Sequence, residues 1–484
     1  MTTSTTVSPS PGAASVTGRR ASLVLIVVLL ASFMDLLDVT IVTVAAPDIA
    51  ADLGAGQAQL QWTVAAYTLA LGSGLITGGR IGDGYGRRKV FLISLACFAA
   101  ASAACALAPS AGVLIAVRAL QGLAAGFMVP QVFGIIRSSF PPAAMAKAFG
   151  AYGAVQGLAA VAGPLLGGAL VEADLRGLGW RTIFWINLPV AMVALVLAVR
   201  VLPESATPAR ARLDVAGAVL AAAAVVLILL PLVQGRDWGW PVWGWVMLAV
   251  GLGLLALFLA YERSVARRGG QPVLDPALLA VRPFTAGLLV SVLFFGALAS
   301  FFLVLSIYLQ AGTGRTAWET GLVILPYAIG SLVTSGVGVA LAAKAGRALV
   351  ITGALSLAAS QGLLWLLVRD GSSPGYWALA GVMFLGGLGL GLGAPILVNV
   401  VLAGVPGRQA GAAGGVLSTV NQIGGALGIA ILGTVFFNAL DAGPATGESA
   451  LASALAEVML WQFGAYVVAA VAMLALPKTA THER

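Results

Sequence analysis

Two aspartates lie in the middle of the first long apolar stretch of this sequence, where a carboxylate is least expected. Asp35 and Asp38 interrupt an apolar run from Ala21 to Ala46. A carboxylate at hydrocarbon depth costs about 2.5–3.5 kcal/mol or more, so it usually faces an aqueous cavity and has a function there. Their three-residue spacing places both carboxyl groups at neighbouring positions on a helix. The chemistry that they indicate is the binding and release of a proton.

Arg118 is the base in the middle of an apolar segment that could face these acids. Burial favours a protonated carboxyl group, whereas a nearby cation favours the ionised form. At about 4 Å and an effective dielectric of about 20, such a pair is worth on the order of 4 kcal/mol. Protonation would then depend on helix separation or on a bound cation; the alternative is a static ion pair. The one histidine, His482, lies in the C-terminal tail, so a histidine relay within the spans is excluded.

The composition places these residues in a membrane protein built from helices. Only 9% of the 484 residues are charged and 60% are hydrophobic, against about 25% charged in ordinary soluble proteins. A bilayer admits helices or closed barrels, and apolar runs of about 20 residues indicate helices. The net charge of +8 does not indicate a nucleic-acid partner, because the basic residues do not cluster on one soluble face.

The sequence also argues against an enzyme or an ATP-driven pump. It contains no Gly-Lys pair, with which a phosphate-binding loop would end. With a single histidine in the tail, little remains from which to build a metal site or a nucleophile–base pair. We therefore expect no metal and no cofactor.

Hydropathy predicts an all-α polytopic protein with fourteen transmembrane helices. They are expected at residues 21–46, 58–80, 88–108, 112–136, 146–171, 182–202, 214–233, 242–262, 284–310, 318–342, 347–368, 375–403, 410–438 and 453–476. Residues 1–18 are predicted to form a disordered tail, and residues 478–484 a cytoplasmic one. Most basic residues then share the side of the N-terminus, so the positive-inside rule predicts cytoplasmic termini in the cytoplasmic membrane.

The fourth and twelfth spans carry the same small residues at an offset near 265. Gly122, Gly126 and Pro130 correspond to Gly387, Gly391 and Pro395. The equal orientation of these spans predicts parallel repeats with a binding site between two halves; chance similarity between Gly-rich helices is the alternative. The predicted division is two six-helix bundles, 19–203 and 284–477, with two inserted helices and their linkers at 204–283.

The repeat indicates which half carries the charge. Arg118 corresponds to Met383, and Asp83 corresponds to Ala343. Charge is present in the N-terminal half and absent at the matching C-terminal positions. We therefore expect ionic coupling to reside mainly in the first six spans.

Three further groups of residues are candidates for function. The loop after the second span is predicted to be a conformational latch, or only a positive-inside anchor; it contains Gly79, Asp83, Gly86, Arg87, Arg88 and Lys89. The fifth span has a stripe of small residues and a proline, for a tight bent contact or for ordinary packing: Gly157, Gly163, Pro164, Gly167 and Gly168. A substrate cavity could be lined by Trp62, Tyr67, Gln121, Tyr152, Asn421 and Gln422, although such side chains often only pack.

These patterns resemble the major facilitator superfamily from the first span to the last. The loop Gly79–Lys89 resembles its loop signature, and Leu114–Gly126 its fourth-span motif. Gly157–Gly168 resembles the antiporter motif of exporters, while Leu37–Pro47 and Trp180–Pro189 match the fourteen-span drug:proton antiporter branch. Gly84 stands where Arg is usual after Asp83, and Thr43 where Asn is common.

The resemblance implies a proton-coupled antiporter of the multidrug efflux type. It would export amphipathic drugs or metabolites by alternating access, and we expect these compounds to be cationic. The proton gradient would drive the transport, and no cofactor would be needed. Its partners would be a small amphipathic substrate, protons and the lipid bilayer; a monomer is compatible with the sequence. The alternative is a proton symporter that imports a small solute, which the fold and the acids also permit.

Overall fold

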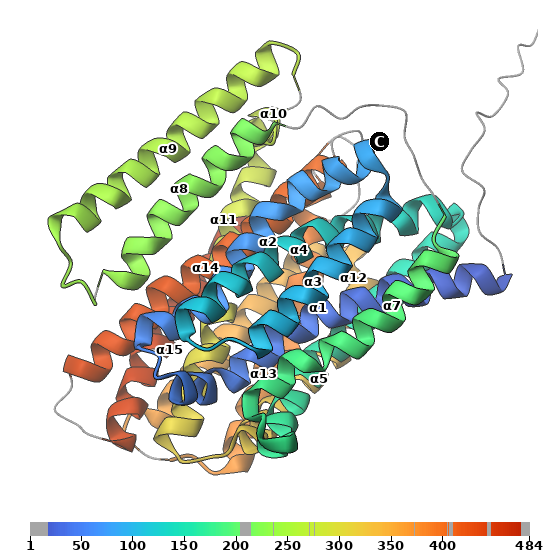
Figure 1. The fold of residues 1–484 in the computed structure, drawn as a ribbon. Coiled ribbons are helices and arrows are strands. Elements are labelled where there is room, and N and C mark those ends of the chain that lie inside the picture. The colour runs from blue at the N-terminus through green and yellow to red at the C-terminus, as the bar shows by residue number, and fades with distance from the viewer. Residues whose placement is uncertain are drawn as a thin grey trace, which may run out of the picture.

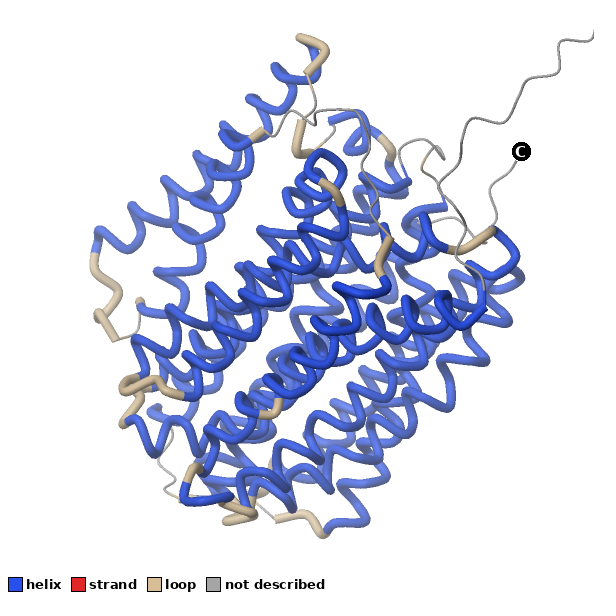
Figure 2. The backbone as a smooth tube through the Cα atoms, turned by 45° about the vertical axis from the view of Figure 1, so that its right-hand side comes forward, coloured by secondary structure: helices blue, strands red, loops and turns tan. Residues whose placement is uncertain are grey.

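The computed structural model of the protein is all-helical in the part of the chain that it describes. That part comprises residues 18–203, 214–235, 237–270, 272–274, 276–371, 373–403, 405, 410–442 and 447–475. Every regular element in these ranges is a helix (Figure 2). The predicted all-α class is therefore confirmed. The two predicted tails lie outside the described residues, except that Gly18 already begins the first helix.

The first part of the chain forms the helices that carry most of the predicted site. These elements are α1 (Gly18–Leu53), α2 (Gln57–Tyr85), α3 (Arg87–Ala106), α4 (Ala111–Ser139), α5 (Pro142–Glu172), η1 (Leu175–Gly177), η2 (Gly179–Arg181), α6 (Thr182–Trp185) and α7 (Asn187–Val201). The sixth predicted span is thus divided between α6 and α7. Pro189 contributes to this division, because it has no N–H to donate to the carbonyl group four residues earlier.

The second part of the chain contains the longest helix. Its elements are α8 (Val215–Gln234), α9 (Val242–Arg267), α10 (Pro276–Ala280), α11 (Arg282–Ile307), η3 (Tyr308–Gly312), α12 (Ala317–Val368), α13 (Tyr376–Ala403), α14 (Ala410–Ala442), α15 (Glu448–Ala472) and η5 (Met473–Ala475). The predicted tenth and eleventh spans both belong to α12. They are separated by Ala345, whose backbone is non-helical (φ −138°, ψ 25°).

Twelve segments within the described residues are long and apolar enough to cross a membrane. Two of them are parts of α12, on either side of its break. α2 and α5, with 29 and 31 residues, lie at the positions of the two remaining predicted spans. The protein is an integral multi-pass membrane protein.

Helices α8 and α9 form a hairpin at the edge of the bundle (Figure 1). Gly251 of α9 lets the two helices approach, since a Cβ there would lie 2.9 Å from Ile228 Cγ1. The outer face of α9 exposes large apolar side chains such as Trp245 and Leu252, as expected of a lipid-facing helix. Arg80 of α2 donates to the carbonyl of Pro272, so the segment after α9 is held against α2.

The packing of α2 on α4 recurs in the packing of α12 on α13. A Cβ on Gly122 would lie 2.9 Å from Tyr67 Cα, and a Cβ on Gly387 would lie 2.9 Å from Tyr327 Cα. Each glycine therefore admits the backbone of the neighbouring helix at a tyrosine. Because the contacts recur at the offsets of the sequence repeat, they favour a structural repeat over chance similarity.

Candidate functional site

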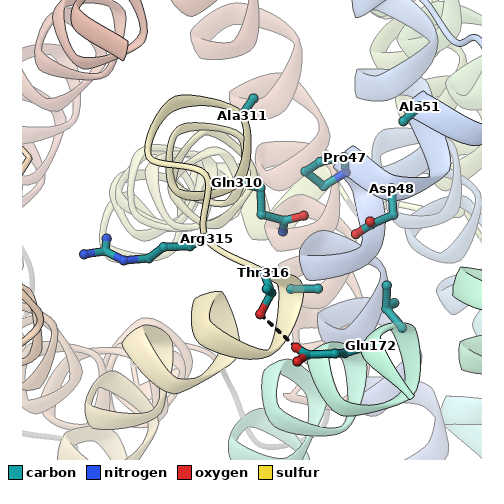
Figure 3. A pocket seen from close by; sticks show the side chains of 10 residues that line it. Pro47, Asp48, Ala51, Glu172, Gln310, Ala311, Arg315 and Thr316 are labelled. Atoms are coloured by element: carbon teal, nitrogen blue, oxygen red, sulfur yellow. Dashed lines mark hydrogen bonds between the residues drawn. The ribbon is translucent and has the colours of Figure 1, made fainter. Parts of the chain in front are cut away.

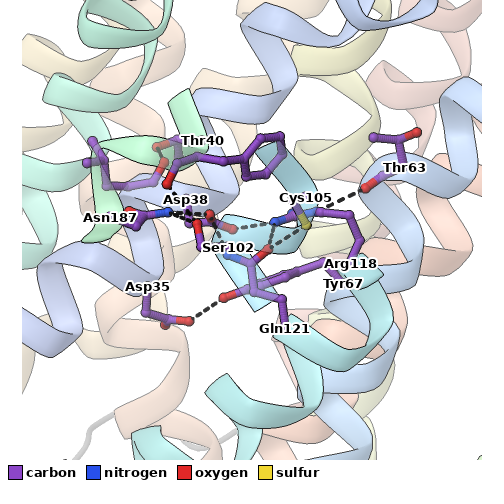
Figure 4. Close-up of polar contacts among 12 residues, drawn as sticks. Asp35, Asp38, Thr40, Thr63, Tyr67, Ser102, Cys105, Arg118, Gln121 and Asn187 are labelled. Atoms are coloured by element: carbon purple, nitrogen blue, oxygen red, sulfur yellow. Dashed lines mark hydrogen bonds and ion pairs between the residues drawn. The ribbon is translucent and has the colours of Figure 1, made fainter. Parts of the chain in front are cut away.

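Asp38 is the centre of a buried polar network formed by α1, α4 and α7 (Figure 4). Its side chain is 0% exposed. One carboxylate oxygen forms an ion pair with Arg118 Nη1. The other accepts hydrogen bonds from Gln121 Nε2 and Asn187 Nδ2, both at 2.8 Å. Charge-assisted hydrogen bonds of this kind are stronger than neutral ones, so three donors hold the Asp38 side chain in place.

Arg118 is also buried, and it has hydrogen-bond and aromatic-ring contacts besides Asp38. It is 1% exposed, and its Nη1 also donates to Gln121 Oε1 at 2.9 Å. Its Nε donates to the carbonyl of Thr63 at 3.3 Å. The guanidinium carbon lies 4.2 Å from the centre of the Tyr67 ring, within the range of a cation–π contact. The predicted opposition of Arg118 and Asp38 is thus present in the structure.

Asp35 has a different partner from Asp38. Tyr67 donates its hydroxyl to Asp35 Oδ1 at 2.7 Å. The same tyrosine packs its ring against Arg118, so it joins the two acids of α1 through the guanidinium. Within the described residues, Asp35 forms its hydrogen bond with Tyr67 and not with Arg118, which separates its role from that of Asp38.

The sequence allows these side chains to meet because of where small residues lie. Asp35 and Asp38 share a face of α1, and Arg118 and Gln121 share a face of α4 by the same spacing. Gly122 follows them and lets α4 approach the backbone of Tyr67 on α2. The close contact brings the guanidinium over the tyrosine ring.

Asn187 is a member of the network that the candidate list lacked. It begins α7 and is 1% exposed. Besides Asp38, its amide donates to Ser102 Oγ at 3.0 Å, and Ser102 donates to the carbonyl of Phe184 at 2.9 Å. The sequence signal for Asn187 was an amide side chain within an apolar stretch. Its partner Asp38 is 149 residues away in the sequence, so residue spacing could not identify the pair.

The small-residue stripe of α5 packs against two other helices. On one side the stripe contacts Thr40 and Ile41 of α1. A Cβ on Gly163 would overlap the Thr40 side chain, and a Cβ on Gly167 would lie 2.9 Å from Ile41 Cγ1. On the other side a Cβ on Gly168 would lie 2.6 Å from Trp318 Cα of α12. The stripe therefore joins α1 to α12 close to Asp38. Gly157 belongs to α5, but its surroundings lie outside the described residues.

Pro164 lies on the same stripe. It is buried, and a Cβ on Gly321 of α12 would lie 3.1 Å from its carbonyl carbon. Proline has no N–H and bends a helix. The position where α5 lacks a backbone donor is thus at its contact with α12.

The junction of α2 and α3 carries a charged cluster that ties these two helices to α4 and α7. Gly86 joins the helices with φ 95°, a conformation that favours glycine. Arg87 pairs with Asp83 at 2.9 Å and donates to the carbonyl of Gly134 on α4 at 2.8 Å. Arg88 donates to the carbonyl of Val199 on α7 at 2.6 Å.

Asp83 lies near the end of α2, and its Oδ1 accepts hydrogen bonds from Arg87 Nε at 3.1 Å and Nη2 at 2.9 Å. Lys89 is exposed, while Gly79 packs near Pro130 of α4, with 3.6 Å between the position of a Cβ and Pro130 Cβ.

The other predicted cavity residues do not join the network. Trp62 is buried and its indole N–H has no hydrogen-bond partner among the described residues. Tyr152 accepts from Gln156 at 3.1 Å, and its ring lies 5.1 Å from that of Phe133. On α14, Asn421 Oδ1 is also unpartnered within the described part of the chain, and Gln422 packs against Gly72.

A cavity of about 490 Å³ lies elsewhere and none of the predicted cavity residues lines it. Nor do the described residues contain a group of three or more His, Cys, Asp or Glu side chains that could hold a metal ion. The groups that the network brings together are a carboxylate, a guanidinium and two amides, which suit proton exchange at the carboxylate.

Comparison with known families agrees with this geometry. Residues 28–429 match the profile of the Major Facilitator Superfamily. The chain belongs to the Major Facilitator Superfamily. It is a membrane transporter and not an enzyme.

Two similar proteins are named as a transporter and as a resistance protein. The chain is 41% identical over 421 residues to the "Probable actinorhodin transporter" of Streptomyces coelicolor, covering 86% of this chain and 72% of that protein. It is 36% identical over 416 residues to the "Puromycin resistance protein pur8" of Streptomyces alboniger, covering 85% and 81%. These relatives are consistent with the drug:proton antiporter branch that the motifs resemble.

A solved superfamily structure shares the fold. The crystal structure titled "peptide transporter POT in complex with sulfate" has a TM-score of 0.67, covers 96% of both chains and is 18% identical. At this identity the likeness concerns the major facilitator fold alone.

Proposed function

We propose that this protein exports small amphipathic compounds, preferentially cations, in exchange for protons. The observation that carries the proposal is the buried Asp38, which faces Arg118 and two amide donors. A carboxylate so deep in an apolar bundle is costly unless it is used or fully paired. Its position on α1, next to the contact of α1 with α5, suits a group whose charge changes as the helices move.

Protonation of Asp38 would weaken the contacts between three helices. A proton on the carboxyl group removes the negative charge that faces Arg118 and occupies an acceptor position. Arg118 would keep Gln121, Thr63 and the Tyr67 ring as partners. The α1–α4 contact therefore loses its strongest interaction while the guanidinium remains placed, so proton binding favours a different helix arrangement.

We extend the proposal to the topology. The protein would have fourteen transmembrane helices, arranged as two six-helix bundles, 19–203 and 284–477, with α8 and α9 inserted between them. Both termini would lie in the cytoplasm and the protein in the cytoplasmic membrane. It would need no cofactor and could act as a monomer, since the Asp38 network is formed within one chain.

Export, rather than import, is supported by two observations. The glycines of α5 form a motif that resembles that of antiporters, and they pack against α1 and α12. The two relatives above carry names that concern antibiotic transport or resistance. A proton symporter would move its solute in the same direction as the proton.

Transport in inverted membrane vesicles distinguishes the two directions of coupling. With an acidic lumen, we expect uptake of a cationic dye into the vesicles and partial dissipation of the pH gradient when dye is added. Collapse of the gradient with an uncoupler should stop the uptake. Accumulation that requires the proton and the solute to move the same way would contradict the proposal.

Changing Pro164 to Ala should slow turnover more than it weakens binding. The added N–H can complete the helical hydrogen bonds and straighten α5 at its contact with Gly321 of α12. We expect the transport rate to fall about tenfold with dye affinity nearly unchanged. Pro231→Ala, in α8, is the matched control within a helix. Equal transport rates of wild type and Pro164→Ala would leave the motif with a packing role only.

A further inference from the structure

A second charged site lies at one end of the bundle, away from the Asp38 network. The cavity of about 490 Å³ lies between the C-terminal ends of α1 and α5 and the segment that joins η3 to α12 (Figure 3). Asp48, in its wall, is ten residues beyond Asp38 on α1, or about 15 Å along the helix. In the proposed topology this end faces the outside of the cell.

Two carboxylates from the N-terminal half face this cavity. Asp48 Oδ2 is buried and has no hydrogen-bond partner among the described residues. Glu172, at the end of α5, accepts a hydrogen bond from the Thr316 hydroxyl at 2.8 Å. An unpartnered buried carboxylate oxygen is costly. A cation that entered the cavity would relieve this cost at Asp48.

The basic residue of the cavity wall does not neutralise these acids. Arg315 donates its Nη2 to the carbonyl of Pro374 at 3.2 Å. Figure 3 shows its side chain directed away from Asp48 and Glu172. Gln310 is near Asp48, but its amide nitrogen donates to the carbonyl of Val44 at 2.7 Å. The charge presented to a ligand is therefore negative.

We infer that this cavity is a release-side binding site for the cationic group of the transported compound. The inference rests on the proposed direction of export, but the cavity is separate from the site of proton binding. Its volume falls within the range of about 300–1,000 Å³ that is usual for small-molecule sites. Pro47, Val171 and Ala311 provide apolar contacts for the body of the ligand. Asp48 recognises its positive charge.

The two halves of the protein contribute opposite walls of this site. The acids come from α1 and α5, whereas Gln310 and Thr316 come from η3 and the start of α12. Two hydrogen bonds cross between these walls: Thr316 to Glu172, and Gln310 to the carbonyl of Val44. When this end opens, the walls separate and the ligand loses its contacts with the wall formed by η3 and the start of α12, which favours release to the outside.

Equilibrium binding of tetraphenylphosphonium to the purified full-length protein in nanodiscs tests this site without a proton gradient. We expect Asp48→Asn to weaken binding about tenfold or more, Glu172→Gln to weaken it less, and Asp48→Glu to retain most of it. Asp370→Asn is the matched control, since Asp370 is an exposed acid near the same end. Monodisperse elution of each variant verifies folding. Unchanged affinity in Asp48→Asn would overturn the inference.

Thiol labelling places the bound cation within the protein. Ala311 lines the cavity, so Ala311→Cys in a Cys97→Ala background should react with a charged methanethiosulfonate reagent. Tetraphenylphosphonium should slow this reaction, and adding Asp48→Asn should remove the protection. Absence of protection would overturn the cavity site. Protection without any proton-coupled transport would instead retain the cavity and refute only the proposed coupling.

Discussion

Asp38→Asn is expected to abolish uphill transport while leaving the protein folded. Asparagine has the size of aspartate, and its amide oxygen can still accept from Gln121 or Asn187. It carries no charge to face Arg118 and cannot bind or release a proton. The pH gradient would then have no carrier at this position, so the ratio of substrate concentrations across the membrane should fall to its equilibrium value.

The measurement is pH-driven dye uptake in inverted vesicles at matched protein levels. Asp35→Asn is the informative comparison, because Asp35 also lies on α1 but bonds to Tyr67 rather than to Arg118. We expect Asp35→Asn to retain part of the coupled transport. Full uphill transport by Asp38→Asn, at wild-type expression, would show that the proton is carried elsewhere.

Arg118→Met is expected to destabilise the protein more than Asp38→Asn, in which Arg118 keeps Gln121, Thr63 and the Tyr67 ring as partners. Arg118→Met leaves the carboxylate of Asp38 buried and without its cation, which costs about 3–5 kcal/mol in comparable buried pairs. The double variant Asp38→Asn/Arg118→Met removes both charges and replaces the guanidinium by an apolar side chain of similar length. It should recover most of the lost stability, because a neutral pair avoids the cost of burying an unpaired charge.

Thermal unfolding of the purified variants measures how the effects of the two substitutions on stability depend on each other. The loss in Arg118→Met should exceed the loss in the double variant, although neither should perform proton-driven transport. If the double variant recovers stability but not transport, the ion pair has a role in transport and is not merely structural. Restored uphill transport in the double variant would mean that the pair serves only stability.

The general fold could be predicted from the sequence because the bilayer constrains it strongly. Runs of about 20 apolar residues allow few structures other than helices, and helices lie at all the predicted positions among the described residues. The exact form of the helices was less predictable. The break at Ala345 within α12 depends on local backbone geometry.

The central pair of the site was also predictable, for the same reason. Asp38 and Arg118 are conspicuous because charge is rare in apolar segments, and opposite charges buried in one bundle tend to pair. The different partner of Asp35 was not predictable. Tyr67 reaches it with its hydroxyl while holding Arg118 with its ring, an arrangement that depends on the close approach of α2 and α4 at Gly122.

The amino-acid sequence alone determined that this chain is a helical membrane protein with an acid and a base inside it, because the cost of exposing or burying charge is set by residue type. Only the tertiary structure decided that Asn187 completes the Asp38 network and that Asp48 and Glu172 share a cavity with residues of η3 and α12. Those contacts join segments more than a hundred residues apart in the chain, and helix packing, not local pattern, brings them together.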